Sequence, residues 1–382
     1  MNILITGANG FIGRGLCDKL LSDGYQVRGA VKGTTQMTAL PSGVEGVQVV
    51  DIGPETDWSE ALSGIEGIVH LAARVHVMDD LADDPLAEFR KVNTAGTLNL
   101  AWQAVVAGVK RVVFISSIKV NGEGTGDDPQ ITQITRIRKR GTRDGGQTTG
   151  WVPLRERMTS MTGMDESLRD WRWIPFGKDD LLRKEWLDGR EVVFSEGDVP
   201  CPQDPYAVSK WEAEQGMLAI AEETGLEVVI IRPPLVYGPG VKANFRSLMK
   251  WVRRGVLLPL GAVHNKRSFV ALDNLVSFII HCIDHPKAAN EVFLISDGED
   301  VSTTELLQKM ARAFGKRSFL LPVPVGLMTF VAGLLGKRDV AERLFGSLQV
   351  DSFKARDLLG WEPVVSMDEA LISHAKAQST QR

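Results

Sequence analysis

Cysteine is scarce in this 382-residue sequence, which contains only Cys17, Cys201 and Cys282. Their wide spacing matches neither a disulfide framework nor a zinc-binding pattern, and it favours a reducing compartment. The first residues enter an apolar strand pattern directly, without the basic segment and cleavage site of a signal peptide. We therefore expect a cytoplasmic protein.

The sequence also lacks a large excess of either positively or negatively charged residues. The 44 Lys and Arg residues face 48 Asp and Glu residues, which gives a net charge of −4. The overall charge therefore gives no reason to expect binding to nucleic acid or to an anionic membrane. His281 and His285 have the i, i+4 spacing of one helix face, but no third ligand accompanies them, so no metal site is predicted.

No apolar run is long enough to cross a membrane, which takes about 20 residues. The most apolar late segment, 319–336, is interrupted by Pro322 and Pro324 and contains two glycines. We expect a buried or surface-docked helix there, with a peripheral membrane contact as the alternative. An integral membrane segment is not predicted.

What the sequence does contain is a clear opening motif, ILITGANGFIG, at residues 3–13. An apolar strand pattern leads into glycines at 7, 10 and 13, and apolar residues then recur at helical spacing. Such a turn lets a phosphate approach the backbone, and the helix N-terminus behind it supplies free N–H groups. The spacing alone also fits an ordinary tight turn, but the flanking strand and helix patterns favour a pyrophosphate site.

Further apolar segments alternate with helical patterns along residues 25–117. This alternation predicts an α/β protein with a Rossmann-type, doubly wound parallel sheet. We assign residues 1–232 to this nucleotide-binding domain. Residues 233–382 form a smaller C-terminal substrate domain, from which about 268–300 returns to the main sheet.

The alternation breaks in a long insertion at about 127–191, where no convincing strand pattern appears. The insertion leans basic and holds four of the nine tryptophans. A poorly ordered excursion, a structured lid and a partner-docking insert are the alternatives.

A second motif places Tyr206 and Lys210 four residues apart in a predicted helix, so that they share one face. A lysine ammonium beside a tyrosine favours the phenolate and lowers its pKa, which suits a residue that exchanges a proton while hydride moves. Ser116 and Ser117 end the fifth predicted strand, at the sheet edge where such folds place reacting groups. Each pattern alone is common in proteins, but together with the glycine turn they predict an oxidoreductase site.

Together these motifs resemble the extended short-chain dehydrogenase/reductase superfamily, and within it the NAD(P)-dependent nucleotide-sugar epimerases and dehydratases. The resemblance covers nearly the whole chain except the insertion, and its motifs include HLAA (70–73), FISSIKVNG (114–122) and IRPPLVYGPG (231–240). It implies that Tyr206 is the catalytic acid/base, that Lys210 activates it, and that Ser117 binds the substrate. It also suggests a homodimer, because relatives often dimerise.

The same resemblance implies contacts for two ligands. A UDP-sugar substrate would meet Ser117, Asn244, Arg267 and Arg343, the last in an uncertain register. Asn93 would support the active-site helix. The implied cofactor contacts are Gly7, Asn9, Gly10, Phe11, Ile12, Gly13, Lys32, Asp51, Ile52, Leu71, Ala72, Ala73, Asn93, Tyr206, Lys210 and Pro233.

The end of the second predicted strand departs from NAD-using relatives, which carry an acidic residue there. Here the sequence reads Val31-Lys32, with Arg28 just before it. Because Lys32 could pair with a 2′-phosphate, NADP(H) is favoured and NAD(H) is the alternative. Arg28 and Lys32 could also be ordinary solvent-facing charges.

A second departure follows the serines, where Ile118-Lys119 replaces the Asp-Glu pair of nucleotide-sugar dehydratases and so disfavours loss of water. We predict hydride transfer at C4 of a UDP-sugar. Because SSIKVNG resembles a bacterial subgroup, the specific prediction is reduction of a 4-keto-6-deoxy (amino)sugar for surface polysaccharide. A UDP-glucose or other UDP-hexose 4-epimerase is the alternative, and a catalytically silent NAD(P)-binding protein is the second alternative.

Overall fold

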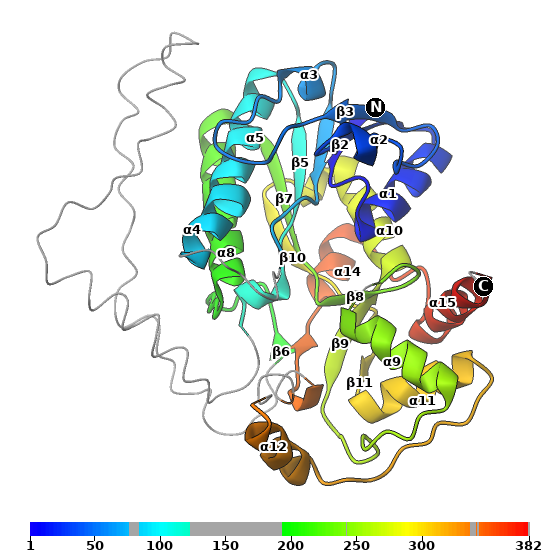
Figure 1. Ribbon diagram of the computed structural model, residues 1–382. Helices are drawn as coiled ribbons and strands as arrows, with labels where there is room; N and C mark the ends of the chain where they lie inside the picture. Colours follow the sequence, from blue (N-terminus) through cyan, green and yellow to red (C-terminus); the bar gives the residue numbers. More distant parts are fainter. Residues whose placement is uncertain (76–83, 123–192, 242, 337–340, 342–343, 381–382) are drawn as a thin grey trace, which may run out of the picture. The chain divides into compact units, whose positions relative to one another are not determined.

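The computed structural model of the protein describes residues 1–75, 84–122, 193–241, 243–336, 341 and 344–380 (Figure 1). The predicted insertion and Arg343 lie outside these residues. The described residues all belong to one compact unit.

A seven-stranded parallel sheet forms the centre of this unit, with strands in the order β10-β7-β5-β4-β1-β2-β3. The order reverses between β1 and β4, and the carboxyl ends of strands at such a switch point form the usual ligand crevice. This arrangement confirms the predicted Rossmann-type, doubly wound fold. The strands are β1 (Asn2–Thr6), β2 (Gln26–Val31), β3 (Glu45–Gln48), β4 (Gly67–His70), β5 (Arg111–Ile115), β7 (Glu227–Arg232) and β10 (Glu291–Leu294).

Alternate residues of the central strands pack on opposite faces of the sheet, as the period of a strand requires. Ile3 and Ile5 of β1 belong to a core with helices α1 (Phe11–Ser22), α10 (Leu272–Asp284) and α14 (Phe353–Leu359). Leu4 belongs to a second core on the other face (Figure 1), formed with α3 (Ser59–Leu62), α5 (Gly96–Val106) and α8 (Pro205–Thr224). Both faces of the sheet are therefore covered, which explains its continuous apolar strands.

Several short elements complete this half of the protein. Helix α2 (Thr34–Met37) follows β2, and α4 (Pro85–Phe89) leads through a π-helical turn, η1 (Arg90–Ala95), into α5. The helical pattern of apolar residues over 86–107 predicts a single helix in place of these last three elements. The remaining short elements are η2 (Ile118–Val120), β6 (Val193–Phe194), η5 (Pro286–Ala288) and β12 (Gln349–Val350).

The C-terminal part has its own sheet and its own apolar core. The strands β8 (Leu235–Tyr237), β9 (Arg267–Ala271) and β11 (Asp300–Val301) form the sheet, in the order β11-β9-β8. Buried side chains from this sheet pack with those of three helices. These helices are α9 (Ala243–Arg254), α11 (Thr303–Ala313) and α15 (Met367–Thr380), and α12 (Val325–Leu334) lies at the lower edge of the view (Figure 1).

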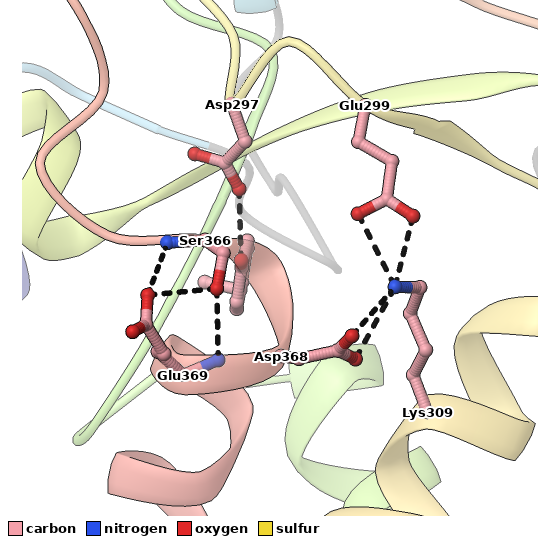
Figure 2. Close-up of polar contacts among 7 residues, drawn as sticks. Asp297, Glu299, Lys309, Ser366, Asp368 and Glu369 are labelled. Carbon is pink, nitrogen blue, oxygen red and sulfur yellow. Dashed lines mark hydrogen bonds and ion pairs between the residues drawn. The ribbon is translucent and has the colours of Figure 1, made fainter.

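Polar contacts fasten α15 and α11 to the connection after β10 (Figure 2). The Lys309 ammonium of α11 lies 2.8 Å from Glu299 and 3.1 Å from Asp368 of α15. Asp297 accepts hydrogen bonds from the Tyr237 hydroxyl at 2.8 Å and from the Asn274 amide at 2.7 Å. Because Asp297 also faces the start of α10, it ties the small sheet to a helix of the main one.

Within the described residues, no helix combines the length and the apolar character needed to cross a membrane. The cytoplasmic location stays a prediction.

Close packing in the glycine turn makes Gly13 irreplaceable by a larger residue. A Cβ placed on Gly13 would lie 2.2 Å from the Gly7 carbonyl oxygen and 2.8 Å from Ala8. Both neighbours are backbone atoms, which cannot move aside without opening the turn.

We expect Gly13→Ala to lower the free energy of unfolding by about 2 kcal/mol or more, because overpacking a tight backbone contact forces the chain to shift. Gly333→Ala in α12 is the matched control, because a Cβ there meets nothing within 4 Å. That change should be neutral or stabilise the helix by up to about 1 kcal/mol. Urea unfolding of both variants measures the difference, and equal effects would contradict the packing argument.

Candidate active site

The glycine turn provides a cradle for a phosphate at the switch point of the sheet. Gly7 has a positive φ of 72°, and the Gly10 N–H donates to its carbonyl oxygen at 2.9 Å. Gly10 caps α1 without any side-chain bond, which leaves N–H groups of the first helical turn for an anion. A Cβ on Gly7 would lie 3.1 Å from the Ala72 nitrogen, so the segment after β4 is packed directly against the turn. These features fit a dinucleotide cofactor.

His70, at the end of β4, is held between two threonines and takes no part in proton exchange. Its ring nitrogens lie 2.7 Å from the Thr6 hydroxyl and 3.0 Å from the Thr97 hydroxyl. Burial lowers the pKa of His70 to about 3, and Lys210 lowers it further. The imidazole therefore stays neutral at ordinary pH and serves to hold the end of β4.

The adenosine end of the predicted cofactor site contains an ion pair that the sequence did not reveal. The Lys32 ammonium after β2 donates to Asp51 at 2.9 Å, and both side chains are well exposed. This hydrogen bond lowers the pKa of the Asp51 carboxyl. A 2′-phosphate approaching Lys32 would also meet the Asp51 carboxylate, which weakens the argument for NADP(H).

Helix α8 carries Tyr206 in its first turn, and the start of this helix is fixed by Asp204. The Asp204 carboxylate accepts the Ala207 N–H at 2.7 Å as an N-cap, and Pro205 occupies the first helical position. The Lys119 ammonium of η2 also lies 2.6 Å from Asp204. Because Ser117 caps η2, this ion pair holds the Ser117 turn against the turn that carries Tyr206.

Lys210 reaches from α8 to the end of β5. Its ammonium donates to the Ile115 carbonyl oxygen at 2.8 Å, two residues before Ser117, and lies 4.4 Å from the centre of the Phe114 ring. The side chain is buried, which lowers the pKa of Lys210 from 10.5 to about 7 against the opposing effect of Glu214.

The pKa of Tyr206 shifts in the direction opposite to the one expected from the sequence. The sequence argument was that Lys210 lowers it, whereas in the protein without ligands burial raises the pKa of Tyr206 above its ordinary value of 10.0, and Asp204 raises it further. Burial of Tyr206 is the larger cause of this rise, and the Lys210 ammonium is directed to the Ile115 carbonyl.

Asn93 connects the segment after β4 with the active-site helix. Its side-chain oxygen accepts the Arg74 N–H at 2.8 Å, and its amide nitrogen donates to the Ser209 hydroxyl at 3.0 Å. The π-helical turn at Arg90–Ala95 places Asn93, which is fully buried, between these partners. This agrees with a supporting contact to α8, whereas a direct contact with a cofactor stays a prediction.

Comparison with known proteins identifies the family. Residues 3–141 and 188–296 match the model of the "NAD dependent epimerase/dehydratase family". The chain is 40% identical over 380 residues to a UDP-glucose 4-epimerase of Vibrio cholerae, covering 98% of this chain and 95% of the relative. The chain belongs to the NAD-dependent epimerase/dehydratase family. The predicted superfamily is thereby confirmed, and with it the prediction of an enzyme.

Solved structures of the family share the fold. A UDP-glucose 4-epimerase of Thermotoga maritima, solved with UDP-glucose, aligns over 100% of this chain and 99% of its own, with a TM-score of 0.64 and 22% identity. A UDP-glucuronic acid 4-epimerase of Bacillus cereus, solved with NAD, aligns over the same shares with a TM-score of 0.65 and 20% identity. At these identities the likeness concerns the fold alone.

Asn121, which belongs to the FISSIKVNG motif, has buried polar partners in the structure. Its side-chain oxygen accepts from the Arg232 guanidinium at 3.0 Å, and its amide nitrogen donates to the Ser195 carbonyl at 2.9 Å. Arg232 is also paired with Glu214 of α8 at 2.5 Å, and all three side chains are buried. Asn121 thus completes a polar network beneath the site, which the FISSIKVNG pattern did not disclose.

The family's implied substrate contacts are placed in the C-terminal part. Asn244 lies exposed in the first turn of α9, and Arg267 begins β9, with its guanidinium 3.3 Å from the Gly346 carbonyl oxygen. The third, Arg343, lies outside the described residues.

Pro233, a predicted cofactor contact, lies next to the Ser117 turn, because its carbonyl oxygen accepts the Ile118 N–H at 3.1 Å. The roles of all these residues stay predictions.

The buried Lys210 should make stability depend on pH. Between pH 7 and pH 10.5 the unfolded chain binds a proton at Lys210 that the native protein does not bind. The resulting free-energy cost is greatest at and below pH 7 and disappears as the pH rises towards 10.5.

We therefore expect the unfolding free energy of Lys210→Met, relative to wild type, to fall by about 2–4 kcal/mol between pH 7 and pH 10. The variant also loses the hydrogen bond to Ile115, but this loss lowers its unfolding free energy by the same amount at pH 7 and at pH 10. It therefore does not contribute to the change between the two pH values. Lys110→Met, at an exposed position, is the control and should show no such change. Urea unfolding at the two pH values measures the effect, and a pH-independent difference would refute it.

Proposed function

We propose that the protein interconverts the C4 epimers of a UDP-hexose, with a nicotinamide dinucleotide retained through the catalytic cycle. The 40% identical relative over nearly the full chain, a UDP-glucose 4-epimerase, supports this choice. The structural observation that carries it is the meeting of η2 with the start of α8, where Lys119 joins Asp204 at 2.6 Å. We infer that this contact keeps Ser117 close to the helix that carries Tyr206 and Lys210.

In this proposal each residue has a distinct task. The bound cofactor supplies the chemistry of hydride removal and return at C4. Tyr206 exchanges the proton of the C4 hydroxyl, and Ser117 holds that hydroxyl by a hydrogen bond. Lys210 lies behind them, where its positive charge favours the phenolate once a substrate and a cofactor surround Tyr206. Asn244 and Arg267 hold the UDP portion.

Two other reactions have less support. Loss of water needs an acid and a base beside Ser117, but that position holds Ile118 and Lys119, and Lys119 is already paired with Asp204. Reduction of a 4-keto sugar uses the same residues as epimerisation but consumes one reduced cofactor in each turnover. The 40% identical UDP-glucose 4-epimerase of Vibrio cholerae favours epimerisation over this reductase reaction.

We propose NAD as the cofactor. The Lys32 ammonium, which was the reason to favour NADP(H), is matched by the Asp51 carboxylate at 2.9 Å. A 2′-phosphate would have to displace or repel that carboxylate. The identity of the nucleotide that copurifies with the protein tests this choice directly.

Epimerase activity predicts turnover without net use of cofactor. Incubation with UDP-galactose should yield UDP-glucose, while the absorbance of the reduced nicotinamide stays constant. Tyr206→Phe should lower kcat by about 10²–10⁴-fold, because it removes the group that exchanges the proton. Its unfolding curve should remain close to that of wild type.

Other outcomes would overturn the proposal in recognisable ways. Stoichiometric loss of NADPH with a UDP-4-keto-6-deoxy sugar, without interconversion of UDP-hexoses, would identify a reductase. Binding of the nucleotide without turnover of any UDP-hexose would identify a catalytically silent protein.

The ion pair between Lys119 and Asp204 should set the pH dependence of the reaction. Asp204 raises the pKa of Tyr206, and Lys119 offsets part of that negative charge. Without Lys119, the Tyr206 pKa should rise further, so that the low-pH limb of kcat/KM in Lys119→Met moves to higher pH by about one unit. Asp204→Asn is the matched variant, and it should move the same limb to lower pH. If both variants move the limb in one direction, the ion pair does not act through charge.

A further inference from the structure

Helix α12 has an exposed face that is entirely apolar. Leu327, Phe330, Val331 and Leu334 recur at helical spacing, and their side chains are 55%, 64%, 45% and 73% exposed. The opposite face carries Val325 and Met328, which pack against the C-terminal core. An ordinary surface helix directs charged or polar residues to the solvent, whereas this helix contains no charged residue on either face.

Two neighbouring segments extend this exposed surface. Phe319 and Leu321, just before α12, are 54% and 46% exposed. They lie beside the loop after α9, because the Leu258 N–H donates to the Phe319 carbonyl at 3.0 Å and Leu321 donates back to Leu258 at 2.8 Å. Leu257 at the tip of that loop is 56% exposed. We call Leu257, Phe319, Leu321 and the exposed face of α12 the apolar edge. Helix α12 itself lies at the lower border of the view (Figure 1).

The chain on both sides of the apolar edge is strongly basic. Residues 241–272 contain seven Lys and Arg and no Asp or Glu, and residues 306–338 contain six Lys and Arg and no Asp or Glu. In the described part, α9 exposes Arg246, Lys250 and Arg254 at i, i+4 spacing, and exposed Lys316 and Arg317 precede Phe319. The Lys316 ammonium donates to the Arg253 carbonyl, so that the two basic segments meet.

We propose that the apolar edge docks on the surface of a bilayer that contains anionic phospholipid. The apolar side chains enter the boundary between headgroups and acyl chains, and the surrounding Lys and Arg side chains contact lipid phosphates. With its 10 residues, α12 is about 15 Å long and cannot cross the bilayer, so it lies in the plane of the surface.

The local charge decides this partner, although the net charge of the chain is −4. Electrostatic interactions are screened beyond about 10 Å at ordinary salt, so a membrane senses mainly the charges nearest to it. Among the basic residues counted above, Lys309 is paired with Glu299 and Asp368 and therefore adds little to this attraction. A second copy of the chain fits less well. A symmetric dimer through the apolar edge would bring together the same two basic segments, and neither of them contains an acidic residue to pair with.

Vesicle flotation of the full-length protein tests the proposal. We expect wild type to bind vesicles of phosphatidylglycerol and phosphatidylcholine at about 1:3 in low salt, and to detach as the salt concentration rises. Binding to pure phosphatidylcholine should be at least about tenfold weaker. Phe330→Asp should lower the partition coefficient by about tenfold or more, because a large apolar group leaves the bilayer and a charge must be desolvated.

Phe353→Asp is the matched control, because Phe353 is 63% exposed and begins α14, a helix that packs against the main sheet and is not part of the apolar edge. It adds the same charge and removes the same side chain, yet it should change vesicle binding by less than about twofold. Both variants should keep the solution activity of wild type towards a water-soluble UDP-hexose. Because vesicle binding is measured without turnover, failure of the proposed epimerase activity would leave this test intact.

Four outcomes would overturn the proposal. The first is wild type that remains unbound at low salt, and the second is equal binding by the two aspartate variants. A wild-type dimer in light scattering that Phe330→Asp dissociates would assign the apolar edge to a second copy. A Phe330→Cys variant that resists a maleimide reagent in the free protein would show that the chain itself covers this face.

Discussion

Three charged side chains of α8 are buried, and the structure around the active site depends on each having a partner. Lys210 is bound to the Ile115 carbonyl of β5, Glu212 to Arg90 of the π-helical turn, and Glu214 to Arg232 of β7. A buried charge that loses its partner costs several kcal/mol, about 3–5 where an ion pair is broken. These contacts therefore fix the position of α8, and with it Tyr206, relative to three separate elements.

Contacts between residues far apart in the chain separate what could be predicted from the sequence from what could not. The glycine turn, the strand and helix alternation, and the common helix of Tyr206 and Lys210 depend on local spacing, which the sequence displays. The π-helical turn around Asn93 and the network of Asn121 depend on partners more than 100 residues away in the chain. The spacing of apolar residues carries no information on such distant partners, so it indicates one continuous helix over 86–107 and assigns no role to Asn121.

The electrostatics of the site show the same limit. From the sequence, Lys210 is expected to lower the pKa of Tyr206, and Lys32 is expected to be available for a 2′-phosphate. In the structure, burial raises the pKa of Tyr206, and Asp51 pairs with Lys32. Both differences arise because the fold decides how far a charged group is exposed to solvent and which other charged groups lie beside it.

The buried network of Asn121, Arg232 and Glu214 has a consequence for any replacement of this loop. An apolar side chain at position 121 would offer no oxygen to the Arg232 guanidinium and would leave one of its donors unpaired in the interior. A loop taken from another protein would therefore need its own acceptor for the Arg232 guanidinium.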